Sequence, residues 1–274
     1  MAPTEEEIST ALAHYRSTVL QNNHAAFVRF VQHAETAQPA DGGLPLSPVS
    51  ISEARPRFIQ RLLDISRPED LDPSIRIDEP ADVLTKWQAL IPVFALDGAH
   101  VGADSDRRAQ LRQEYKTGVE AGLARIEGAE ELAFPADFEF LMTQVDDLVG
   151  NGWPQYREEG QQLRFWDGLG ESQDEVADRV YSPDDNLAEL AGLEDWEVSA
   201  GWWCGRGPEA TCFIVYCRNE DQDKEWGWRY VAQLGQYGEE IFEDVVGLLQ
   251  WYATLYVPPM DHRFNIYLTD IFKN

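Results

Sequence analysis

Short runs of aromatic and β-branched residues occupy one stretch in the back half of the chain, between two helical patterns. These runs are Leu163–Trp166, Trp196–Cys204, Cys212–Cys217 and Trp228–Leu234. The polar residues between the last two runs predict a hairpin loop at Arg218–Lys224. The strands do not alternate with helices along the chain, as the strands of a parallel sheet would. The chain is therefore predicted to be an α+β protein, with an antiparallel sheet flanked by helices.

The first part of the chain is helical in pattern. Thr4 and Glu7 have the spacing of a capping box, and apolar residues recur at helical intervals from Ile8 to Val19. Asn22 and Asn23 interrupt this pattern, so a second helix is expected to begin after them. Residues 1–105 are predicted to form an α-helical N-terminal extension.

The remaining residues, 106–274, are predicted to form the α+β domain. Helical spacing marks residues 105–126, 134–145 and 239–255, and the last of these begins with acidic residues, which favour a helix N-terminus. The alternation of apolar residues in Arg263–Phe272 predicts an additional edge strand.

Acidic side chains outnumber basic ones by 49 to 22, and the formal charge is -27. This charge disfavours duplex nucleic acid and anionic membranes as direct partners, because both require a basic surface. The excess is uneven: residues 138–274 hold 27 acidic and 9 basic side chains, against 22 and 13 in residues 1–137. The half that contains the predicted strands is therefore the half expected to meet a basic protein.

The compartment is predicted from the N-terminus and the cysteines. The first residues lack the basic and apolar segments of a secretory signal, and no apolar run reaches about 18 residues, so neither a secretory signal nor a transmembrane helix is expected. Its three cysteines cannot form a complete disulfide framework and have no CxxC spacing. We expect a cytoplasmic protein with reduced thiols. No catalytic, metal-binding or cofactor motif is found, which predicts a protein without a cofactor that is not an enzyme.

Tryptophans are concentrated in the predicted strands. Alternation along the strands places Trp196 and Trp202 on one face with Trp203 opposed, and Trp226 on the same face as Trp228. Each could be a core residue, but exposed aromatic residues are enriched at protein interfaces.

One pair of carboxylates permits an alternative function. Asp195 and Glu197 could share a strand face beside an aromatic ring, as acidic residues do in carbohydrate-binding proteins and glycoside hydrolases. A glycosidase, however, needs two carboxylates at a defined spacing across the sugar, which sequence neighbours do not by themselves supply.

The segment Ile126–Leu141, followed by Gly150-Asn151-Gly152, resembles the opening of SUKH domains. These domains include yeast Smi/Knr-type cell-wall regulators and bacterial toxin-immunity proteins. The matching residues are Glu130, Phe134-Pro135, Asp137, Phe140-Leu141 and Gly152. The resemblance extends loosely over residues 112–257, through the strands and the helix that follows them. The long acidic insert at residues 168–193 and the helical front depart from the minimal pattern.

The resemblance implies a binding module with no shared catalytic residue. We therefore expect a scaffold, regulatory or immunity-like protein that engages a protein partner through an acidic, aromatic-rich sheet face. The expected contact residues are Trp202, Trp203, Trp226, Trp228 and Tyr230, with the acidic neighbours Glu194, Asp195, Asp221 and Asp223. The aromatic residues would anchor the partner and the acids would steer it. A further alternative is that the helical front carries the function and the SUKH-like part is a platform.

Overall fold

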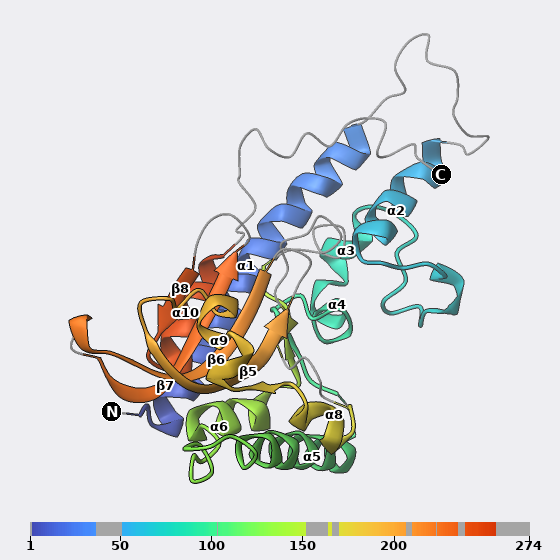
Figure 1. The fold of residues 1–274 in the computed structure, drawn as a ribbon. Coiled ribbons are helices and arrows are strands. Elements are labelled where there is room, and N and C mark those ends of the chain that lie inside the picture. The colour runs from blue at the N-terminus through green and yellow to red at the C-terminus, as the bar shows by residue number, and fades with distance from the viewer. Residues whose placement is uncertain are drawn as a thin grey trace. The chain divides into compact units, whose positions relative to one another are not determined.

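The computed structural model describes residues 2–36, 51–102, 104–151, 164–165, 170–206, 210–222, 224–234 and 239–255. It confirms the predicted α+β class with antiparallel sheets (Figure 1). Two expectations, Asp223 and the edge strand at 263–272, lie outside the described residues. None of the helices in the described ranges is both long and apolar enough to cross a membrane.

The chain divides into two compact units at positions that differ from the expected boundary at residue 105. One unit includes residues 1–15, Ala99–Gly150 and most of the chain up to Ala253, and the other is built on Arg16–Gly98. The division falls within the first helix because Tyr15 belongs to the sheet-containing unit. Its ring stacks on Tyr252, with 5.7 Å between the centroids, and its hydroxyl accepts a hydrogen bond from Gly150 N at 2.8 Å.

The first helix, α1 (Glu5–Thr36), is continuous, so the predicted break at Asn22 and Asn23 is wrong. Both amide side chains have partners elsewhere in the chain. Asn23 is fully buried and its Nδ2 donates to Leu96 O at 2.7 Å, while Asn22 Nδ2 donates to Asn151 Oδ1 at 3.0 Å. These tertiary bonds satisfy side chains that would otherwise favour a turn.

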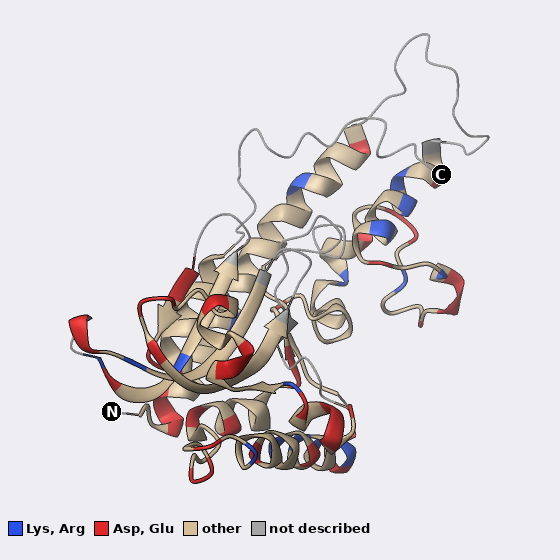
Figure 2. Ribbon diagram, viewed as in Figure 1, with Lys and Arg blue, Asp and Glu red and all other residues tan. Residues whose placement is uncertain are grey.

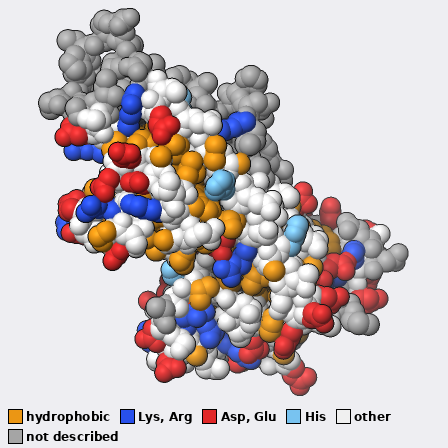
Figure 3. All heavy atoms as spheres, turned by 180° about the vertical axis from the view of Figure 1, so that it is seen from behind, with side chains coloured by type: hydrophobic (Ala, Val, Ile, Leu, Met, Phe, Trp, Pro, Cys, Tyr) orange, Lys and Arg blue, Asp and Glu red, His pale blue; other side chains and the backbone are white. Residues whose placement is uncertain are grey.

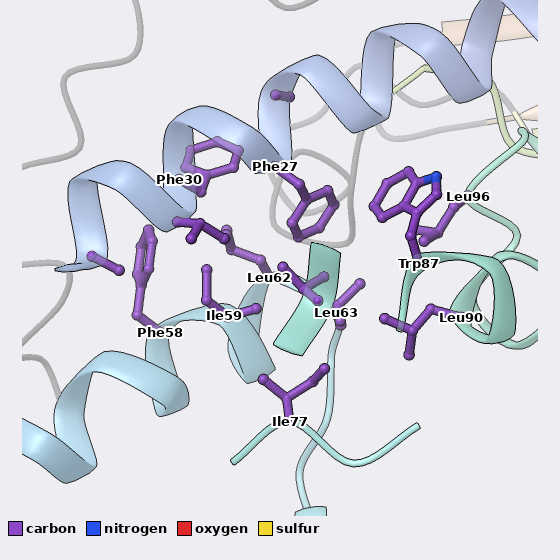
Figure 4. Close-up of a cluster of buried hydrophobic side chains, with 14 residues drawn as sticks. Phe27, Phe30, Phe58, Ile59, Leu62, Leu63, Ile77, Trp87, Leu90 and Leu96 are labelled. Atoms are coloured by element: carbon purple, nitrogen blue, oxygen red, sulfur yellow. The ribbon is translucent and has the colours of Figure 1, made fainter. Parts of the chain in front are cut away.

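The helical unit contains the second half of α1 together with α2 (Ile51–Leu62), α3 (Asp82–Thr85) and α4 (Trp87–Phe94), and a short 3-10 helix at Pro68–Asp70. Its core consists of large apolar side chains from all of these α-helices, including Phe27, Phe58, Leu62 and Trp87 (Figure 4). This core explains the helical spacing that the front of the sequence shows.

The sheet-containing unit begins with β1 (Ala99–His100), which pairs with β2 (Asp147–Leu148). Between them lie α5 (Ser105–Leu123) and α6 (Ala136–Gln144), close to their predicted ranges. Further on, α8 (Gln173–Ala177) packs on α5 at Gly118 and Gly122, which leave room for its backbone. A Cβ on Gly122 would lie only 2.7 Å from Ala177 O.

The main sheet has the strand order β3-β5-β6-β7-β8, and β4 also pairs with β5. All of its strand pairs are antiparallel. The described strands are β3 (Arg164–Phe165), β4 (Val180–Tyr181), β5 (Glu197–Arg206), β6 (Ala210–Asn219), β7 (Lys224–Leu234) and β8 (Glu239–Phe242). The short helices α9 (Leu187–Leu190), Pro183–Asp185 and Glu220–Gln222 complete the connections. The last of these forms the predicted hairpin loop between β6 and β7.

The predicted helix at 239–255 is wrong in its first residues. Glu239–Phe242 form β8, whose residues pair with Tyr230–Gln233 of β7, and only then does α10 (Val245–Thr254) begin. The Asp244 carboxylate accepts a hydrogen bond from Gly247 N at 2.9 Å and so satisfies an amide of the first turn. Pairing with a neighbouring strand thus overrides the acidic pattern typical of a helix start.

The two faces of the sheet are covered by different elements. One, the α9 face, packs Trp203, Phe213, Val215 and Val231 against Leu187 and other residues near α9. The other, the α6 face, carries Trp202 and Tyr230, which contact Phe134 and Phe138 beside and within α6.

Candidate functional site

Side chains along a strand alternate between the two faces of the sheet, and the predicted faces of the tryptophans depend on this alternation. A bulge in β5 interrupts it. The register of β5 against β6 shifts between Val198 and Ala200, so one extra residue lies in β5. Trp196 therefore packs with the α9 face, whereas Trp202 lies on the α6 face. The prediction that Trp196 and Trp202 share a face is wrong, because the extra residue moves the side chains from Ala200 to Trp203 to the opposite face, up to a second register shift between Trp203 and Gly205.

Two of the predicted contact residues belong to the core. Trp202 is 2% exposed, and its indole Nε1 donates to the Tyr115 hydroxyl at 3.0 Å. Tyr230 is fully buried, and its hydroxyl donates to Asp137 Oδ1 at 3.0 Å. Neither side chain can contact a partner in this fold, so both leave the candidate surface. Their polar groups are satisfied inside the protein, as buried aromatic residues require.

Asp137, one of the residues that carry the SUKH resemblance, joins three elements in this core. In addition to the hydrogen bond from the Tyr230 hydroxyl, its carboxylate accepts hydrogen bonds from Phe138 N at 2.9 Å and from Val245 N at 3.1 Å. These bonds connect α6, β7 and the start of α10. Burial raises the pKa of the Asp137 carboxyl above its ordinary value, although the three donated hydrogen bonds act in the opposite direction. Asp137 therefore has a structural role.

The remaining predicted aromatic residues differ in exposure. Trp203 is half-buried against Tyr181 and Phe213 on the α9 face. Trp228 is half-buried on the α6 face, where its Nε1 donates to Ala133 O at 3.0 Å. Trp226 is 37% exposed and is the best placed of the three for contact with another molecule.

Trp226 lies at the end of a series of aromatic contacts that begins in the core. Trp202 contacts Trp228 with 5.3 Å between ring centroids, and Trp228 contacts Tyr216 at 5.2 Å. Tyr216 in turn stacks on Trp226, at 5.4 Å and an interplanar angle of 16°. The prediction that Trp226 and Trp228 share a face is confirmed, since both contact the same Tyr216 ring. Packing of this kind holds the exposed indole in a fixed position.

Sequence reasoning missed Tyr216 as a site residue. The signal that could have found it is the hairpin itself, because Tyr216 pairs directly with Trp228 across β6 and β7. Cross-strand neighbours on one face lie within side-chain contact distance.

The predicted acidic residues lie at the same end of the sheet as Trp226. Asp221 is exposed in the hairpin loop, and Glu194 and Asp195 are exposed in the turn before β5. Asn219, the last residue of β6, donates from Nδ2 to Asp195 O at 3.3 Å and so brings the turn against the hairpin. Figure 2 shows acidic residues at the tip of this hairpin, and Figure 3, seen from behind, shows acidic side chains gathered at the right-hand edge.

We call this region the hairpin-end surface. It comprises exposed or half-buried side chains from β5, β6, β7 and their connections: Glu194, Asp195, Glu197, Tyr216, Arg218, Glu220, Asp221, Glu225 and Trp226. Among these residues the cation is Arg218, and the adjacent cation Lys224 of β7 pairs with Glu243. Arg218 pairs with Glu197 at 2.7 Å and with Glu220 at 2.9 Å, and its guanidinium carbon lies 5.3 Å from the centre of the Trp226 ring. The hydrogen bond to Glu197 raises the pKa of Arg218 further.

The arrangement of Asp195 and Glu197 bears on the carbohydrate alternative. Glu197 is engaged by the Arg218 guanidinium through both Nε and Nη2. The ring of the intervening Trp196 packs toward the α9 face, where the Arg229 guanidinium lies 5.7 Å from its centre. The aromatic ring and the carboxylates thus do not combine into a shared platform. Carbohydrate binding or hydrolysis by these residues stays a prediction, as does a function of the helical front.

Within the described ranges, no group of three or more His, Cys, Asp or Glu side chains is placed to hold a metal ion. The three cysteines are buried free thiols. Comparison with known proteins adds no further assignment, since no protein-family profile, curated protein or solved structure matched the chain.

Proposed function

We propose that this chain is a non-enzymatic protein-binding module that engages a basic protein through the hairpin-end surface. The observation that carries the proposal is the exposed Trp226, held by Tyr216 and surrounded by more carboxylates than cations. Interface hot spots are enriched in tryptophan that is fixed by its neighbours. The acidic surroundings increase the rate of encounter with a basic partner and disfavour acidic ones.

The charge distribution supports a basic partner. The net charge of -27 favours partners of opposite sign, and two thirds of the excess lies in residues 138–274, which include this surface. The role within the cell is proposed to be scaffolding, regulation or immunity-like neutralisation, as the resemblance to SUKH domains implies. The buried free cysteines suit a reducing compartment such as the cytoplasm.

Affinity capture with matched variants tests the proposal. The tagged full-length chain is used to capture proteins from native lysate, and the test variant is Trp226→Ala/Asp221→Ala. The control variant is Val101→Ala/Asp174→Ala, which removes an exposed apolar side chain and an exposed carboxylate from the α5 side of the same unit. Quantitative mass spectrometry then compares the captured proteins.

We expect a basic protein that the wild type and the control variant capture equally and the test variant loses. Raising the salt concentration should weaken this capture, because exposed charges are screened. Equal capture by both variants would contradict a role for the hairpin-end surface, and a captured partner that is acidic would contradict the steering argument.

A further inference from the structure

Arg218 is held within the hairpin-end surface as a bound arginine ligand would be. Its Nε and Nη2 donate to Glu197 Oε2 at 2.9 and 2.7 Å, and its Nη1 lies 2.9 Å from Glu220 Oε1. Its guanidinium carbon is 5.3 Å from the centre of the Trp226 ring. Carboxylates that accept from several guanidinium nitrogens, with an aromatic ring alongside, are the groups with which proteins recognise arginine.

Arg218 is not locked into this position by burial. Its side chain is 31% exposed, and those of Glu197 and Glu220 are 55% and 69% exposed. Exposed ion pairs contribute little to folding stability, because water solvates the separated charges well. Arg218 can therefore leave at small cost, whereas Trp226 stays in place through its stacking on Tyr216.

We infer that the hairpin-end surface recognises an arginine of its protein partner, and that Arg218 occupies this arginine site until the partner displaces it. The inference rests on the proposed function and specifies the chemistry of the partner. Exchange of one guanidinium for another keeps Glu197 and Glu220 paired throughout, and Arg218 returns to solvent. The neighbouring carboxylates Asp221 and Glu225 remain available to further basic residues of the same segment.

The site is expected to discriminate arginine from lysine. A guanidinium is planar, so it can bond to carboxylates through several nitrogens while it lies against the Trp226 ring. A lysine ammonium can take part in the charge interaction but cannot reproduce this combined geometry. A charged surface without a specific site would bind both residues equally.

Fluorescence anisotropy with defined peptides tests the inference. The probes are a short labelled peptide with arginines spaced by glycines and the same peptide with lysines, each titrated with the full-length chain. The variants are Arg218→Ala and Trp226→Ala. The matched control is Arg125→Ala, which removes the same charge from another exposed ion pair, that with Asp178 at 2.7 Å. Circular dichroism confirms that each variant is folded.

We expect the arginine peptide to bind the wild type about threefold more tightly than the lysine peptide, as a cation–π contact at an exposed site allows. Arg218→Ala should tighten arginine-peptide binding by about threefold or more, because the internal competitor is gone. Arg125→Ala should change it by less than about twofold, the size of a screened long-range charge effect. Trp226→Ala should abolish the preference for arginine.

Equal tightening by Arg218→Ala and Arg125→Ala would overturn the inference, since it would reflect net charge alone. Weaker binding by Arg218→Ala would also overturn it, because Arg218 would then contact the peptide itself. The two proposals fail separately. If capture of a partner depends on Trp226 and Asp221 but the peptides show no arginine preference, only the arginine site is refuted; if capture does not depend on them, the proposed function is refuted.

Discussion

Replacement of Asp137 by alanine should destabilise the sheet-containing unit far more than replacement of a neighbouring exposed acid. Asp137 accepts hydrogen bonds from Phe138 N, Tyr230 Oη and Val245 N at distances of 2.9 to 3.1 Å. Tyr230 and Val245 are fully buried. Without the carboxylate, these two donors lose the partner that satisfies them in a largely buried position, where a lost hydrogen bond costs more than it does at the surface.

The magnitude follows from these two buried donors. Each donor left unsatisfied costs about 1–3 kcal/mol, so the gross loss is about 2–6 kcal/mol. Removal of a carboxylate whose burial raises its pKa recovers part of this loss. We therefore expect Asp137→Ala to lower the free energy of unfolding by about 2–4 kcal/mol. Tyr230→Phe in the same chain should offset part of the effect, because it removes one of the two orphaned donors.

Urea-induced unfolding, followed by far-UV circular dichroism, measures these differences. The control is Glu139→Ala on the same helix; the Glu139 side chain is 46% exposed, and its carboxylate bonds to Lys116 Nζ at 2.7 Å. This control should cost less than about 1 kcal/mol, as exposed ion pairs do. The reasoning would be refuted if Asp137→Ala were no more destabilising than Glu139→Ala, or if Tyr230→Phe added its full cost to that of Asp137→Ala.

The pH dependence has a defined sign. Because the pKa of Asp137 is raised above its ordinary value of 3.8 in the folded state, the native state binds a proton more tightly than the unfolded chain does. The associated stabilisation is fully present below the unfolded pKa and is lost as pH rises through the folded pKa. Asp137→Asn, which does not titrate, should lack this fall, so the wild type should lose stability relative to the variant as pH rises through that interval.

Two further substitutions test the separation of core and surface. Trp202→Ala should cost about 3–5 kcal/mol in unfolding free energy, and Trp226→Ala less than about 1 kcal/mol, since only Trp202 is enclosed on all sides; similar losses for both would contradict the assignment of Trp226 to the surface. Gly122→Ala should destabilise by about 1–3 kcal/mol because the new Cβ would meet Ala177 O of the adjacent helix. Gly247 lies in helix α10, and a Cβ there would have its nearest neighbour at 3.6 Å, so Gly247→Ala should be neutral or stabilising by up to about 1 kcal/mol. Thermal unfolding measures both glycine variants. If Gly247→Ala were destabilised as much as Gly122→Ala, the steric argument would be wrong.

Local patterns were sufficient where an element is specified by its own residues. The spacing of apolar residues located α5 and α6, and the aromatic and β-branched runs located β5, β6 and β7 with their hairpin loop. They were insufficient at Glu239–Phe242, where an acidic segment typical of a helix start pairs with β7 instead. The stability of this pairing depends on β7, which offers its edge to residues 239–242. The pattern of residues 239–242 alone carries no information about that strand.

For the candidate surface, the sequence by itself determined the residue types and their chemistry. The acidic excess of residues 138–274 and the tryptophans of the strands are properties of composition and order, and the expectation of a basic partner and an aromatic anchor rests on them. Asp221, Glu194 and Asp195 were also correctly expected to be exposed, because charged side chains are rarely buried without a partner.

Only the tertiary structure decided which aromatic residue is available. Trp202 and Trp226 are the same residue type in strands β5 and β7, which β6 separates, yet Trp202 is 2% exposed beneath Phe134 and Trp226 is 37% exposed at the hairpin end. The bulge between Val198 and Ala200 sets the face on which Trp202 lies, and the helix packed on that face sets its burial. Both depend on contacts between segments distant along the chain, so strand periodicity could identify the candidate tryptophans but could not choose between them.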